Sequence, residues 1–429
     1  MIKKKLKILN IAPFPVYSPR DGGAIIFLNR SFLLSEKGHE IDFVIFKDSS
    51  QDVVAKNAEP EEFEKKFNDK VYIIKKKNKL KSFLKSVFSL NPHALFKHKL
   101  DKAESKNIIN LLRSKHYDIV LFETIHSYPC YKLIKKELKN QNIKSVYFSH
   151  NIYYKDIYNL YKESNNYLRK FFYFVESLKY KRIESLYIKK FSLIFTVSLV
   201  DKNILTEINP DAKVIWIPAI INAGSEKLDI ENTDINANLN KGYKVEAEKL
   251  NNELKLSGYN YKILFTGSLA YISNIIAVKW FSEKVMPILL KNINCCFIVV
   301  GRNPSDEIFD LVKNNKDIII FPNVESVTPF YNIADLVVVP LFNDAGVKIK
   351  LVEALKFRKK VIARPEGVRG SGLRNIIQTA ETPEDFAKKC IGILRSETHD
   401  DSFWKEFDDI YNNDKIIGNF ENILFDYIN

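Results

Sequence analysis

Short apolar runs alternate with helical patterns from residue 261 to residue 363, and this alternation constrains the fold more than any other feature of the chain. Each run has the length and composition of a buried strand, and apolar residues recur at helical spacing between the runs. Such alternation builds a parallel sheet that is covered by helices on both faces. The expected strands are residues 261–266, 295–300, 318–321, 336–339 and 360–363, and the expected helices are residues 275–290, 306–314, 327–331 and 347–357.

The first half of the chain carries a second set of strand and helix patterns. With 429 residues, 46% of them hydrophobic, the chain is long enough to form two cores. Residues 219–260 are mostly polar and predict a linker with an insertion. We therefore expect an α/β protein with Rossmann-like domains at 1–218 and 261–400 and a final helical segment at 401–429. In the first domain we expect a helix at 24–35, strands at 6–14, 40–46, 118–122, 144–148 and 193–197, and a last strand that ends near residue 218.

Cysteine usage and the length of the apolar runs bear on the compartment. The four cysteines, Cys130, Cys295, Cys296 and Cys390, have no metal-ligand spacing, and we expect all four to be reduced core residues. The apolar run at residues 8–15 is too short and too quickly broken by proline to be a signal peptide. No apolar run approaches the ~20 residues of a membrane span. These features predict a cytoplasmic location.

Basic residues are concentrated in the first half of the chain. Residues 1–200 hold 38 Lys and Arg against 20 Asp and Glu, whereas residues 201–429 hold 28 against 32. This asymmetry predicts an anionic partner for the first half, with nucleic acid and anionic lipid as candidates. The stretch 75–90, which begins at Lys75 and ends at Leu90, combines lysines with an apolar stripe. It is typical of a helix at an anionic membrane surface, and equally of a surface helix that packs its stripe on its own domain.

The segment at residues 340–354 is the strongest candidate for a ligand site. The expected strand 336–339 leads into a polar loop and then into a helical pattern. This places Gly346, Lys348 and Lys350 outside the carboxyl end of a strand, where helix N–H groups and the helix dipole favour an anion. The two lysines add positive charge, and Glu353 is placed to accept hydrogen bonds from sugar hydroxyls. The segment therefore suits a phosphate that carries a sugar.

Motifs in the second half resemble those of retaining GT-B glycosyltransferases of family 4, the bacterial group 1 glycosyltransferases. The motifs occur in the order that the family has, and they are specific for the superfamily rather than for one sugar. They read FTGSL at 265–269 with Asn274 and WF at 280–281, IVVGRNP at 298–304, GVKIKLVEAL at 346–355, KKVIA at 359–363 and EG at 366–367.

The resemblance implies the GT-B fold, in which two Rossmann-like domains face each other across a cleft and C-terminal helices cross back to the first domain. It also implies a nucleotide-sugar donor, transfer with retention at the anomeric carbon, and neither a metal nor another cofactor. Lys348, Lys350 and the N–H groups near Gly346 would stabilise the leaving diphosphate, and Glu353 would bind the ribose. The other donor-binding residues expected are Gly267, Ser268, Asn274, Arg302, Val324, Asp344 and Val347.

Two places depart from the family pattern. The residue eight positions before Glu353, where the family has a second glutamate, is Ala345, and the neighbouring Asp344 is a candidate substitute. The stretch 268–274 lacks the arginine and lysine that many members place at the diphosphate, and Lys348 is the candidate to compensate. These departures leave the sugar open. Arg302 and Val324, placed near the base and phosphate by the resemblance, are equally compatible with solvated turn residues.

Polar residues near the ends of strands in the first domain are candidates for the acceptor side. Gly22 and Gly23 predict a turn between the first strand and the first helix, although a plain tight turn explains such a pair equally well. His150 and Asn151 follow the strand 144–148, and the resemblance implies that they face the donor sugar, with His150 as a catalytic candidate. His126 follows the preceding strand and is a weaker candidate for acceptor contact.

Residues 156–190 form a long helical pattern in which aromatic residues are mixed with lysines and arginines. We interpret the pattern as a helix with an aromatic core face and a charged solvent face. Stacking of nucleic-acid bases on the aromatic residues is the alternative interpretation.

These features together predict a metal-independent retaining hexosyltransferase that extends a surface polysaccharide or a lipid-linked glycan, in the cytoplasm or on the inner face of the membrane. A GT-B nucleotide-sugar 2-epimerase is an alternative that would need acid and base carboxylates, which the sequence does not identify. A basic nucleic-acid-binding protein, which we do not expect, would bind with strong salt dependence and ignore nucleoside diphosphates. The last alternative is a degenerate transferase that binds a donor without turnover, because Ala345 replaces a sugar-contacting acid.

Overall fold

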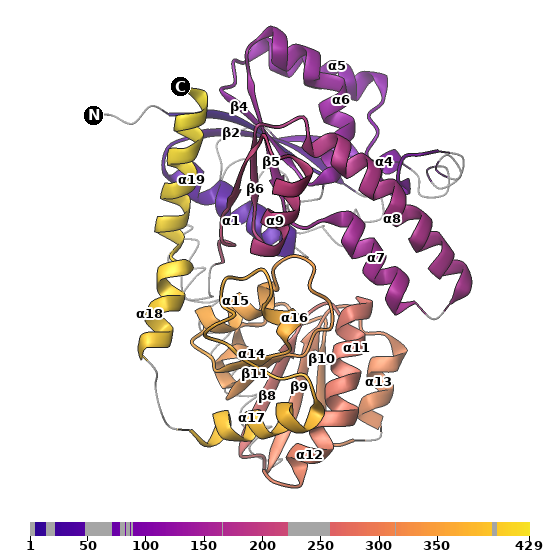
Figure 1. Ribbon diagram of the computed structural model, residues 1–429, viewed down its shortest axis with the longest axis vertical. Coiled ribbons are helices and arrows are strands. Elements are labelled where there is room, and N and C mark those ends of the chain that lie inside the picture. Colours follow the sequence, from indigo (N-terminus) through magenta and orange to yellow (C-terminus); the bar gives the residue numbers. More distant parts are fainter. Residues whose placement is uncertain are drawn as a thin grey trace. The chain divides into compact units, whose positions relative to one another are not determined.

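The computed structural model describes residues 5–13, 22–47, 71–77, 82, 86, 89–164, 166–221, 258–313, 315–396 and 401–429 (Figure 1). The chain divides into two compact units. The first unit comprises Met1–Ile220 together with Tyr411–Asn429, and the second comprises Ile221–Ile410. Most of the predicted insertion, and most of the basic stretch 75–90, lie outside the described residues.

In the described part of the first unit, a parallel sheet of seven strands has the order β3-β2-β1-β4-β5-β6-β7. Its strands are β1 (Lys7–Ala12), β2 (Glu40–Lys47), β3 (Val71–Lys75), β4 (Ile119–Glu123), β5 (Lys144–Ser149), β6 (Leu193–Thr196) and β7 (Lys213–Trp216). The expected strands are confirmed, and β4 and β6 are buried along their whole length, as their unbroken apolar sequences require. β3 was not predicted, because its four apolar residues lie between a polar segment and a run of lysines.

Helices cover both faces of this sheet. On one face, Leu112 of α5, Ile134 of α6 and Tyr187 of α8 share a buried cluster with Phe122 of β4. On the other face, Phe27 of α1 contacts the ring of Phe43 in β2. The helices are α1 (Gly22–Glu36), α4 (His93–Lys97), α5 (Lys102–Ser114), η2 (Ile125–Ser127), α6 (Tyr128–Asn140), α7 (Tyr153–Glu163), α8 (Tyr167–Ile188), α9 (Leu199–Ile208) and α19 (Asn413–Ile428).

Two expectations about helices are wrong. Gly22 and Gly23 form the first turn of α1 and not a loop before it, since glycine is tolerated at a helix start. The pattern at 156–190 forms two helices, because the side chain of Asn166 accepts a hydrogen bond from the N–H of Arg169 and starts α8 anew. The final segment is helical, as expected, and consists of two helices, with the side chain of Asn412 as the cap of α19.

In the described part of the second unit, a six-stranded parallel sheet has the order β10-β9-β8-β11-β12-β13. The five expected strands are confirmed, and β13 is a two-residue addition that pairs with β12. The strands are β8 (Tyr261–Thr266), β9 (Cys295–Gly301), β10 (Ile318–Pro322), β11 (Leu336–Val339), β12 (Val361–Ala363) and β13 (Gln378–Thr379). The helices are α11 (Ile272–Trp280), η3 (Phe281–Val285), α12 (Met286–Leu290), α13 (Asp306–Lys313), α14 (Thr328–Ile333), α15 (Ile349–Lys356), α16 (Pro365–Val368), α17 (Pro383–Arg395) and α18 (Asp401–Ile410).

Each sheet has one point at which the strand order reverses. In the first unit this point lies between β1 and β4, and in the second it lies between β8 and β11. Ligands of open α/β sheets bind outside the carboxyl ends of strands at such a point. The loops after β4 in the first unit, and after β8 and β11 in the second, are therefore the places to look for a site.

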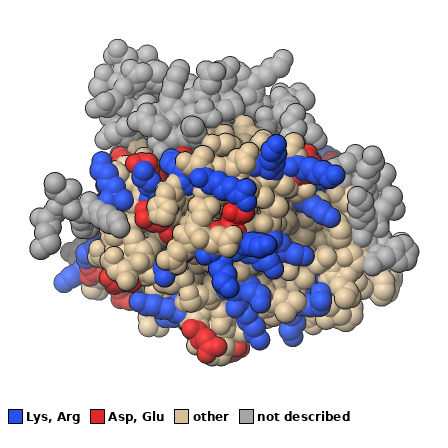
Figure 2. Space-filling model, turned by 90° about the horizontal axis from the view of Figure 1, so that it is seen from above, with Lys and Arg blue, Asp and Glu red and all other residues tan. Residues whose placement is uncertain are grey.

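The expectation for the cysteines is confirmed, because all four are buried and free. In the described ranges, no helix is long and apolar enough to cross a membrane. Lys and Arg side chains spread over much of the face shown in Figure 2, with Asp and Glu in fewer places.

Candidate active site

The loop after β11 turns sharply into α15. Gly346 has a φ of +63°, in the left-handed region that favours glycine. Lys348 occupies the N-cap position and makes no cap hydrogen bond with its side chain. The first N–H groups of α15 thus point out of the carboxyl end of the sheet without a side-chain cap from Lys348, and the helix dipole there favours an anion.

Lys350 reaches from the first turn of α15 to the end of β8. Its Nζ donates a hydrogen bond to Oδ1 of Asn274 at 2.9 Å and lies 3.8 Å from the centre of the Phe265 ring. Burial lowers the pKa of Lys350 well below its ordinary value; Lys348 lowers it further, and Glu353 opposes the shift. An anion that binds beside this amine would raise its pKa again.

The side chains of Lys350 and Asn274 approach the backbone of Gly267 too closely for any residue with a Cβ. A Cβ at Gly267 would lie 2.8 Å from Nζ of Lys350 and 2.9 Å from Nδ2 of Asn274. Gly301, at the end of β9, is constrained by the same loop, because a Cβ there would lie 1.8 Å from the carbonyl oxygen of Gly267. Nδ2 of Asn274 also donates to the carbonyl of Ser268 at 2.8 Å, so the amide is held at both ends. The result is a glycine turn with a fixed amine and a fixed amide close against its backbone.

Glu353 lies one turn beyond Lys350 on α15. Its Oε2 accepts a hydrogen bond from the hydroxyl of Tyr331 at 3.2 Å, and that hydroxyl lies 2.9 Å from Oγ1 of Thr266 in β8. Burial raises the pKa of Glu353, while Tyr331 and Lys350 oppose the shift. The carboxylate is therefore held by the same strand end that carries Gly267.

Lys348 is held by the loop that precedes α15. Its Nζ donates to Oδ1 of Asn343 at 2.7 Å and to the carbonyl of Ala345 at 2.6 Å. Nδ2 of Asn343 in turn donates to Oγ of Ser273 in α11 at 2.6 Å. The two lysines thus belong to neighbouring hydrogen-bond networks, one centred on Asn343 and the other on Asn274.

The remaining donor-side candidates lie at the margins of these networks. Asp344, the candidate substitute for the missing glutamate, pairs with Arg369 at 3.2 Å, and both side chains are partly exposed. Val347, which stands between Gly346 and the N-cap residue Lys348 in the sequence, is partly buried. The carbonyl of Arg302 accepts the N–H of Leu269 at 2.8 Å, which ties the loop after β9 to the loop after β8.

Val324 follows β10 and is partly exposed, next to Asn323 with its φ of +55°. The contacts described above for Lys350 and Asn274 involve neither the Val324 side chain nor that of Arg302. Among the donor-side candidates, the structure therefore brings together Gly267, Ser268, Asn274, Lys350 and Glu353.

Three side chains meet at the reversal point of the first unit. Glu123 is the last residue of β4, His150 follows β5, and Arg30 lies on α1. Arg30 forms an ion pair with Oε1 of Glu123, and Nε2 of His150 lies 2.7 Å from Oε2. All three side chains are at most 7% exposed. The guanidinium lies 3.8 Å from the ring centre of Phe148 and 5.5 Å from that of Phe420 in α19.

Charge is balanced within this group. Burial alone would raise the pKa of Glu123, but Arg30 and His150 outweigh it, so the pKa is lowered. Burial lowers the pKa of Arg30, and Glu123 opposes that shift. A carboxylate held in this way fixes the orientation of the imidazole that it contacts.

Two acceptor-side candidates serve the structure of their own elements. Gly23 is partly buried in the first turn of α1, directly after Gly22. Nδ2 of Asn151 donates a hydrogen bond to Oδ2 of Asp156, which ties the end of β5 to the first turn of α7. Asn151 is thus the residue next to His150, but its side chain bonds to α7 and not to the Arg30 group.

His126 lies in an aromatic cluster after β4. Its Nε2 is 3.0 Å from the hydroxyl of Tyr180, and its ring packs edge to face on Tyr153 with centroids 4.5 Å apart. Burial lowers the pKa of His126 well below its ordinary value, and His98 lowers it further. His126 is therefore neutral at neutral pH.

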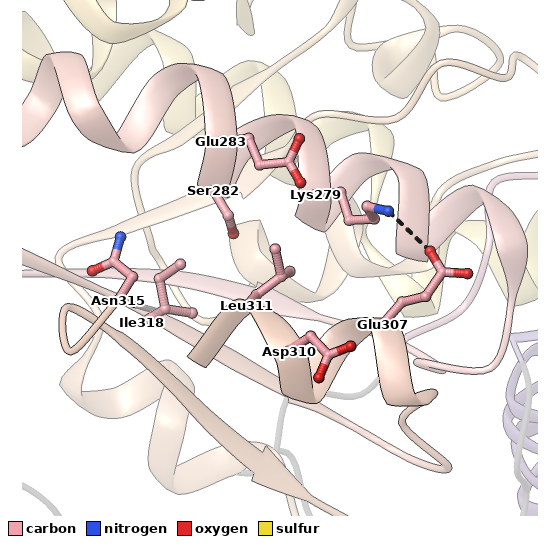
Figure 3. A pocket seen from close by; sticks show the side chains of 8 residues that line it. All are labelled: Lys279, Ser282, Glu283, Glu307, Asp310, Leu311, Asn315 and Ile318. Carbon is pink, nitrogen blue, oxygen red and sulfur yellow. Dashed lines mark hydrogen bonds and ion pairs between the residues drawn. The ribbon is translucent and has the colours of Figure 1, made fainter. Parts of the chain in front are cut away.

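A separate pocket lies between α11, η3 and α13, and none of the predicted site residues lines it (Figure 3). Its volume is about 360 Å³. The only lysine of its lining, Lys279, is paired with Glu307 at 3.0 Å. Two further carboxylates make the lining acidic, which disfavours a diphosphate. The lining residues are Lys279, Ser282, Glu283, Glu307, Asp310, Leu311, Asn315 and Ile318.

Within the ranges that the structure describes, no group of three or more His, Cys, Asp or Glu side chains is placed to hold a metal ion. The amine beside Gly267 belongs to Lys350, and Lys348 lies close enough to lower the pKa of that amine.

The fold is GT-B, the fold of a large class of glycosyltransferases. Residues 260–396, which make up most of the second unit, match the family model described as "Glycosyl transferases group 1". The resemblance of the sequence motifs to group 1 glycosyltransferases is thereby confirmed.

Similar proteins extend over nearly the whole chain. A protein of Klebsiella pneumoniae described as "Uncharacterized 44.6 kDa protein in cps region" is 22% identical over 400 residues, which is 91% of each chain. A glycosyltransferase from Rickettsia africae is similar in structure, with a TM-score of 0.64, 16% identity and 98% of each chain covered. HepE from Anabaena, solved with UDP, has a TM-score of 0.63 at 10% identity and covers 98% of this chain and 100% of its own.

Arg30, Glu123 and Asn343 are among the residues of these networks that the sequence does not predict. Arg30 has no signal beyond a charge in an apolar helical pattern, and Glu123 only follows the expected strand 118–122. Asn343 lies next to Asp344 in the same loop, and its polar side chain is the only signal that the sequence offers for it. Their roles depend on contacts between distant elements, since Arg30 and Glu123 are 93 positions apart.

Proposed function

We propose that the protein is a retaining glycosyltransferase that moves a hexose from a nucleotide-sugar to a glycan or lipid-linked acceptor. The observation that carries the proposal is the close approach of Lys350 and Asn274 to the glycine turn at Gly267, at the reversal point of the second sheet. The group 1 match over residues 260–396 supports transfer of a sugar. HepE, with a similar fold, has been solved with UDP and with UDP-glucose, which supports a nucleotide-sugar as donor.

The second unit would bind the diphosphate of the donor. When the bond between the anomeric carbon and the β-phosphate oxygen breaks, negative charge develops on the leaving nucleoside diphosphate. Lys350 and the N–H groups at the start of α15 are placed to stabilise this charge, and Lys348 would join them by exchanging its bond to Asn343 for a phosphate oxygen. Glu353 would accept hydrogen bonds from the ribose hydroxyls. Because these groups supply the positive charge, we propose that the reaction needs no metal.

The acceptor hydroxyl would attack from the face that the diphosphate leaves, so that configuration is retained. A new bond forms between the acceptor oxygen and the anomeric carbon, and the hydroxyl proton passes to the departing phosphate. No protein base is then required. In the first unit, His150 would polarise a hydroxyl of the transferred sugar, with its ring oriented by Glu123 and the charge of Glu123 balanced by Arg30.

The acceptor is proposed to belong to surface polysaccharide biosynthesis. The relative from a cps region of Klebsiella pneumoniae supports this choice. A cytoplasmic protein that meets a lipid-linked acceptor would bind the inner face of the membrane. The basic stretch 75–90 remains a proposed contact with anionic lipid, although most of it lies outside the described residues.

Titration calorimetry of the full chain with UDP, GDP and ADP, in EDTA and then in Mg²⁺, tests donor binding. We expect one nucleoside diphosphate to bind without metal, and Lys350→Met to weaken it by at least tenfold. Lys279→Met is the matched control, because it removes a lysine from the pocket of Figure 3. The proposal fails if no nucleoside diphosphate binds, or if Lys350→Met binds as tightly as the unchanged protein.

Transfer is tested with the sugar conjugate of the nucleotide that binds. The anomeric proton coupling of the product, followed by NMR as it forms, should match that of the donor. An inverted product would exclude the retaining mechanism, and an epimerised nucleotide-sugar without a free nucleoside diphosphate would favour an epimerase.

A further inference from the structure

Helices α7 and α8 form a hairpin that projects from the first unit. In Figure 1 the two helices lie side by side, and the turn between them points away from the sheet. Tyr161 of α7 packs against Phe174 of α8 with ring centroids 5.6 Å apart. Further along α8, Tyr180, Ile183 and Tyr187 are buried in the core of the unit. The hairpin is therefore anchored at one end and exposed at the other.

The exposed half of α8 carries an apolar stripe. Tyr167, Phe171, Phe174 and Leu178 are spaced by four, three and four residues and thus lie on one face of the helix. Their exposed fractions are 88%, 70%, 40% and 53%, and the adjacent Leu168 is 83% exposed. This corrects the interpretation from sequence, which placed the aromatic face of this pattern in the core. Adjacent apolar side chains left in water mark a surface that another body covers.

Basic side chains border the stripe. Lys170 lies 5.4 Å from the ring centre of Tyr161, and Lys162 lies 4.9 Å from that of Tyr158, so both pack along aromatic faces. Arg169 is exposed beside Tyr167 and Leu168 at the start of α8. At the other end of the stripe, Lys181 and Arg182 are exposed one turn beyond Leu178.

Two of the four acids of this hairpin are withdrawn from its surface. Glu176 is buried and accepts hydrogen bonds from the N–H of His93 and from Lys179. Glu184 is buried and accepts from the N–H groups of Tyr153 and Tyr154. The surface of the hairpin is therefore positive around an apolar centre.

We propose that this stripe binds an anionic lipid surface. Tyr167, Leu168 and Phe171 would enter the interface between headgroups and acyl chains, while the surrounding lysines and arginines contact lipid phosphates. Tyrosine suits this depth, because its ring is apolar and its hydroxyl reaches water. A protein partner fits less well, because protein interfaces use about 20–30 residues a side and are depleted of lysine.

The inference is independent of the proposed transfer reaction, because it concerns only a surface of the first unit. It also differs from the lipid contact expected at residues 75–90, because here the side chains that enter the membrane lie at the tip of the α7–α8 hairpin.

Sedimentation of the full chain with vesicles tests the assignment. Vesicles of phosphatidylcholine with 30% phosphatidylglycerol are compared with vesicles of phosphatidylcholine alone. We expect binding to the first kind that weakens as NaCl is raised. The triple variant Tyr167→Ser, Leu168→Ser, Phe171→Ser should bind at least tenfold more weakly. Leu186→Ser, which replaces an apolar residue 45% exposed on another face of the same helix, is the matched control and should bind as the unchanged protein does.

Insertion is tested separately from attraction. The single variant Phe171→Trp should be quenched by lipids brominated on their acyl chains more strongly than Leu186→Trp is. The proposal is overturned if the unchanged protein binds neither kind of vesicle, or if the triple variant binds like the unchanged protein. A triple variant that alters only the oligomeric state, measured by light scattering, would assign the stripe to a second copy and also overturn it. Nucleoside diphosphate binding, measured in parallel, separates this outcome from failure of the proposed function.

Discussion

The amine of Lys350 is buried, and Asn274 holds it in place beside the glycine turn at Gly267. Burial weakens its hold on the proton, and an anion that binds beside it would strengthen that hold again. Its protonation is thus coupled to donor binding.

We expect binding of a nucleoside diphosphate to take up a proton, because the anion raises the lowered pKa of Lys350 toward its ordinary value. The affinity should therefore fall as pH rises through the interval between the two pKa values. Titration calorimetry in buffers that differ in ionisation enthalpy measures the proton. Lys350→Arg stays charged at all these pH values and should bind without that uptake. Equal uptake by both proteins would assign the proton to another group.

At this scale, the residues that could be predicted are those whose role is local. The segment with Gly346, Lys348 and Lys350 follows a strand and begins a helix. The turn and the positive charge can therefore be predicted from neighbouring positions in the sequence. The role of Arg30 depends on a contact between α1 and β4. No residue near Arg30 in the sequence indicates that it pairs with Glu123. The contact of Glu123 with His150 could not be predicted for the same reason, because the two residues are 27 positions apart.

At the scale of elements, the ends of β8 and β9 approach each other too closely for a side chain. Gly301→Ala places a Cβ 1.8 Å from the carbonyl of Gly267, so the loop after β8 must move. We expect a loss of about 1–3 kcal/mol in the free energy of unfolding and at least tenfold weaker nucleotide binding, measured by denaturant titration and calorimetry.

The matched control for this change is Gly392→Ala in α17. A Cβ there meets nothing within 4 Å, so the substitution should stabilise the unit by about 0.5–1 kcal/mol and leave binding unchanged. A Gly301→Ala variant as stable as the unchanged protein, with the same affinity, would show that the two loops separate without cost.

Glu184 makes the start of α7 sensitive to pH. Its carboxyl oxygens accept the N–H groups of Tyr153 and Tyr154 at 3.0 and 3.1 Å, and α7 has no cap from its own N-cap side chain. Burial raises the pKa of Glu184 to about 8, although both N–H groups oppose the shift.

Because the folded state binds this proton more tightly than the unfolded state, stability should fall as pH rises from about 4.5 to about 8 and then level off. Glu184→Gln does not titrate, so the difference in unfolding free energy between the two proteins should change across this range. Denaturant unfolding of both proteins at several pH values measures it, and a difference independent of pH would contradict the raised pKa.

The elements that could be predicted are those with one uninterrupted pattern. Continuous apolar runs gave every strand of the second unit except β13, whose two residues are too few to form a pattern. The break between α7 and α8 was hidden, because a cap such as Asn166 looks like any polar residue inside an amphipathic sequence. The exposure of the α8 stripe was equally hidden, since periodicity shows that a face exists and not what covers it.

At the scale of the whole molecule, the first unit is discontinuous in sequence. Residues Tyr411–Asn429 belong to it, although the second unit lies between them and Ile220. Glu421 of α19 contacts His39 at 3.0 Å, and Phe420 packs on Phe195 with ring centroids 4.6 Å apart. The same Phe420 lies against the guanidinium of Arg30. The last helix therefore supports the group around Glu123.

Phe420→Ala should destabilise the first unit by about 3–5 kcal/mol, because it leaves a cavity among Phe148, Phe195 and Arg30. Nucleotide affinity should be unchanged, since the glycine turn at Gly267 lies in the second unit. Scanning calorimetry with and without nucleotide distinguishes the effects: the variant should lower the transition of one unit, and nucleotide should raise that of the other. A common shift of both transitions would mean that the units unfold together.

The two sheets could be predicted from the alternation of patterns along the chain. That alternation does not say which sheet the final helical segment covers, because an amphipathic helix fits either one. Only the resemblance to a known family implied an answer.

Because α19 belongs to the first unit but lies at the end of the sequence, the first unit cannot be completed until the whole chain has been synthesised. A ribosome delivers residues 1–220 long before residues 411–429, so the nascent first unit waits without the helix that covers Phe148 and Phe195 until the second unit has been translated. During that interval an apolar face of the sheet is open to chaperones, and the second unit, which needs no later segment, can fold first.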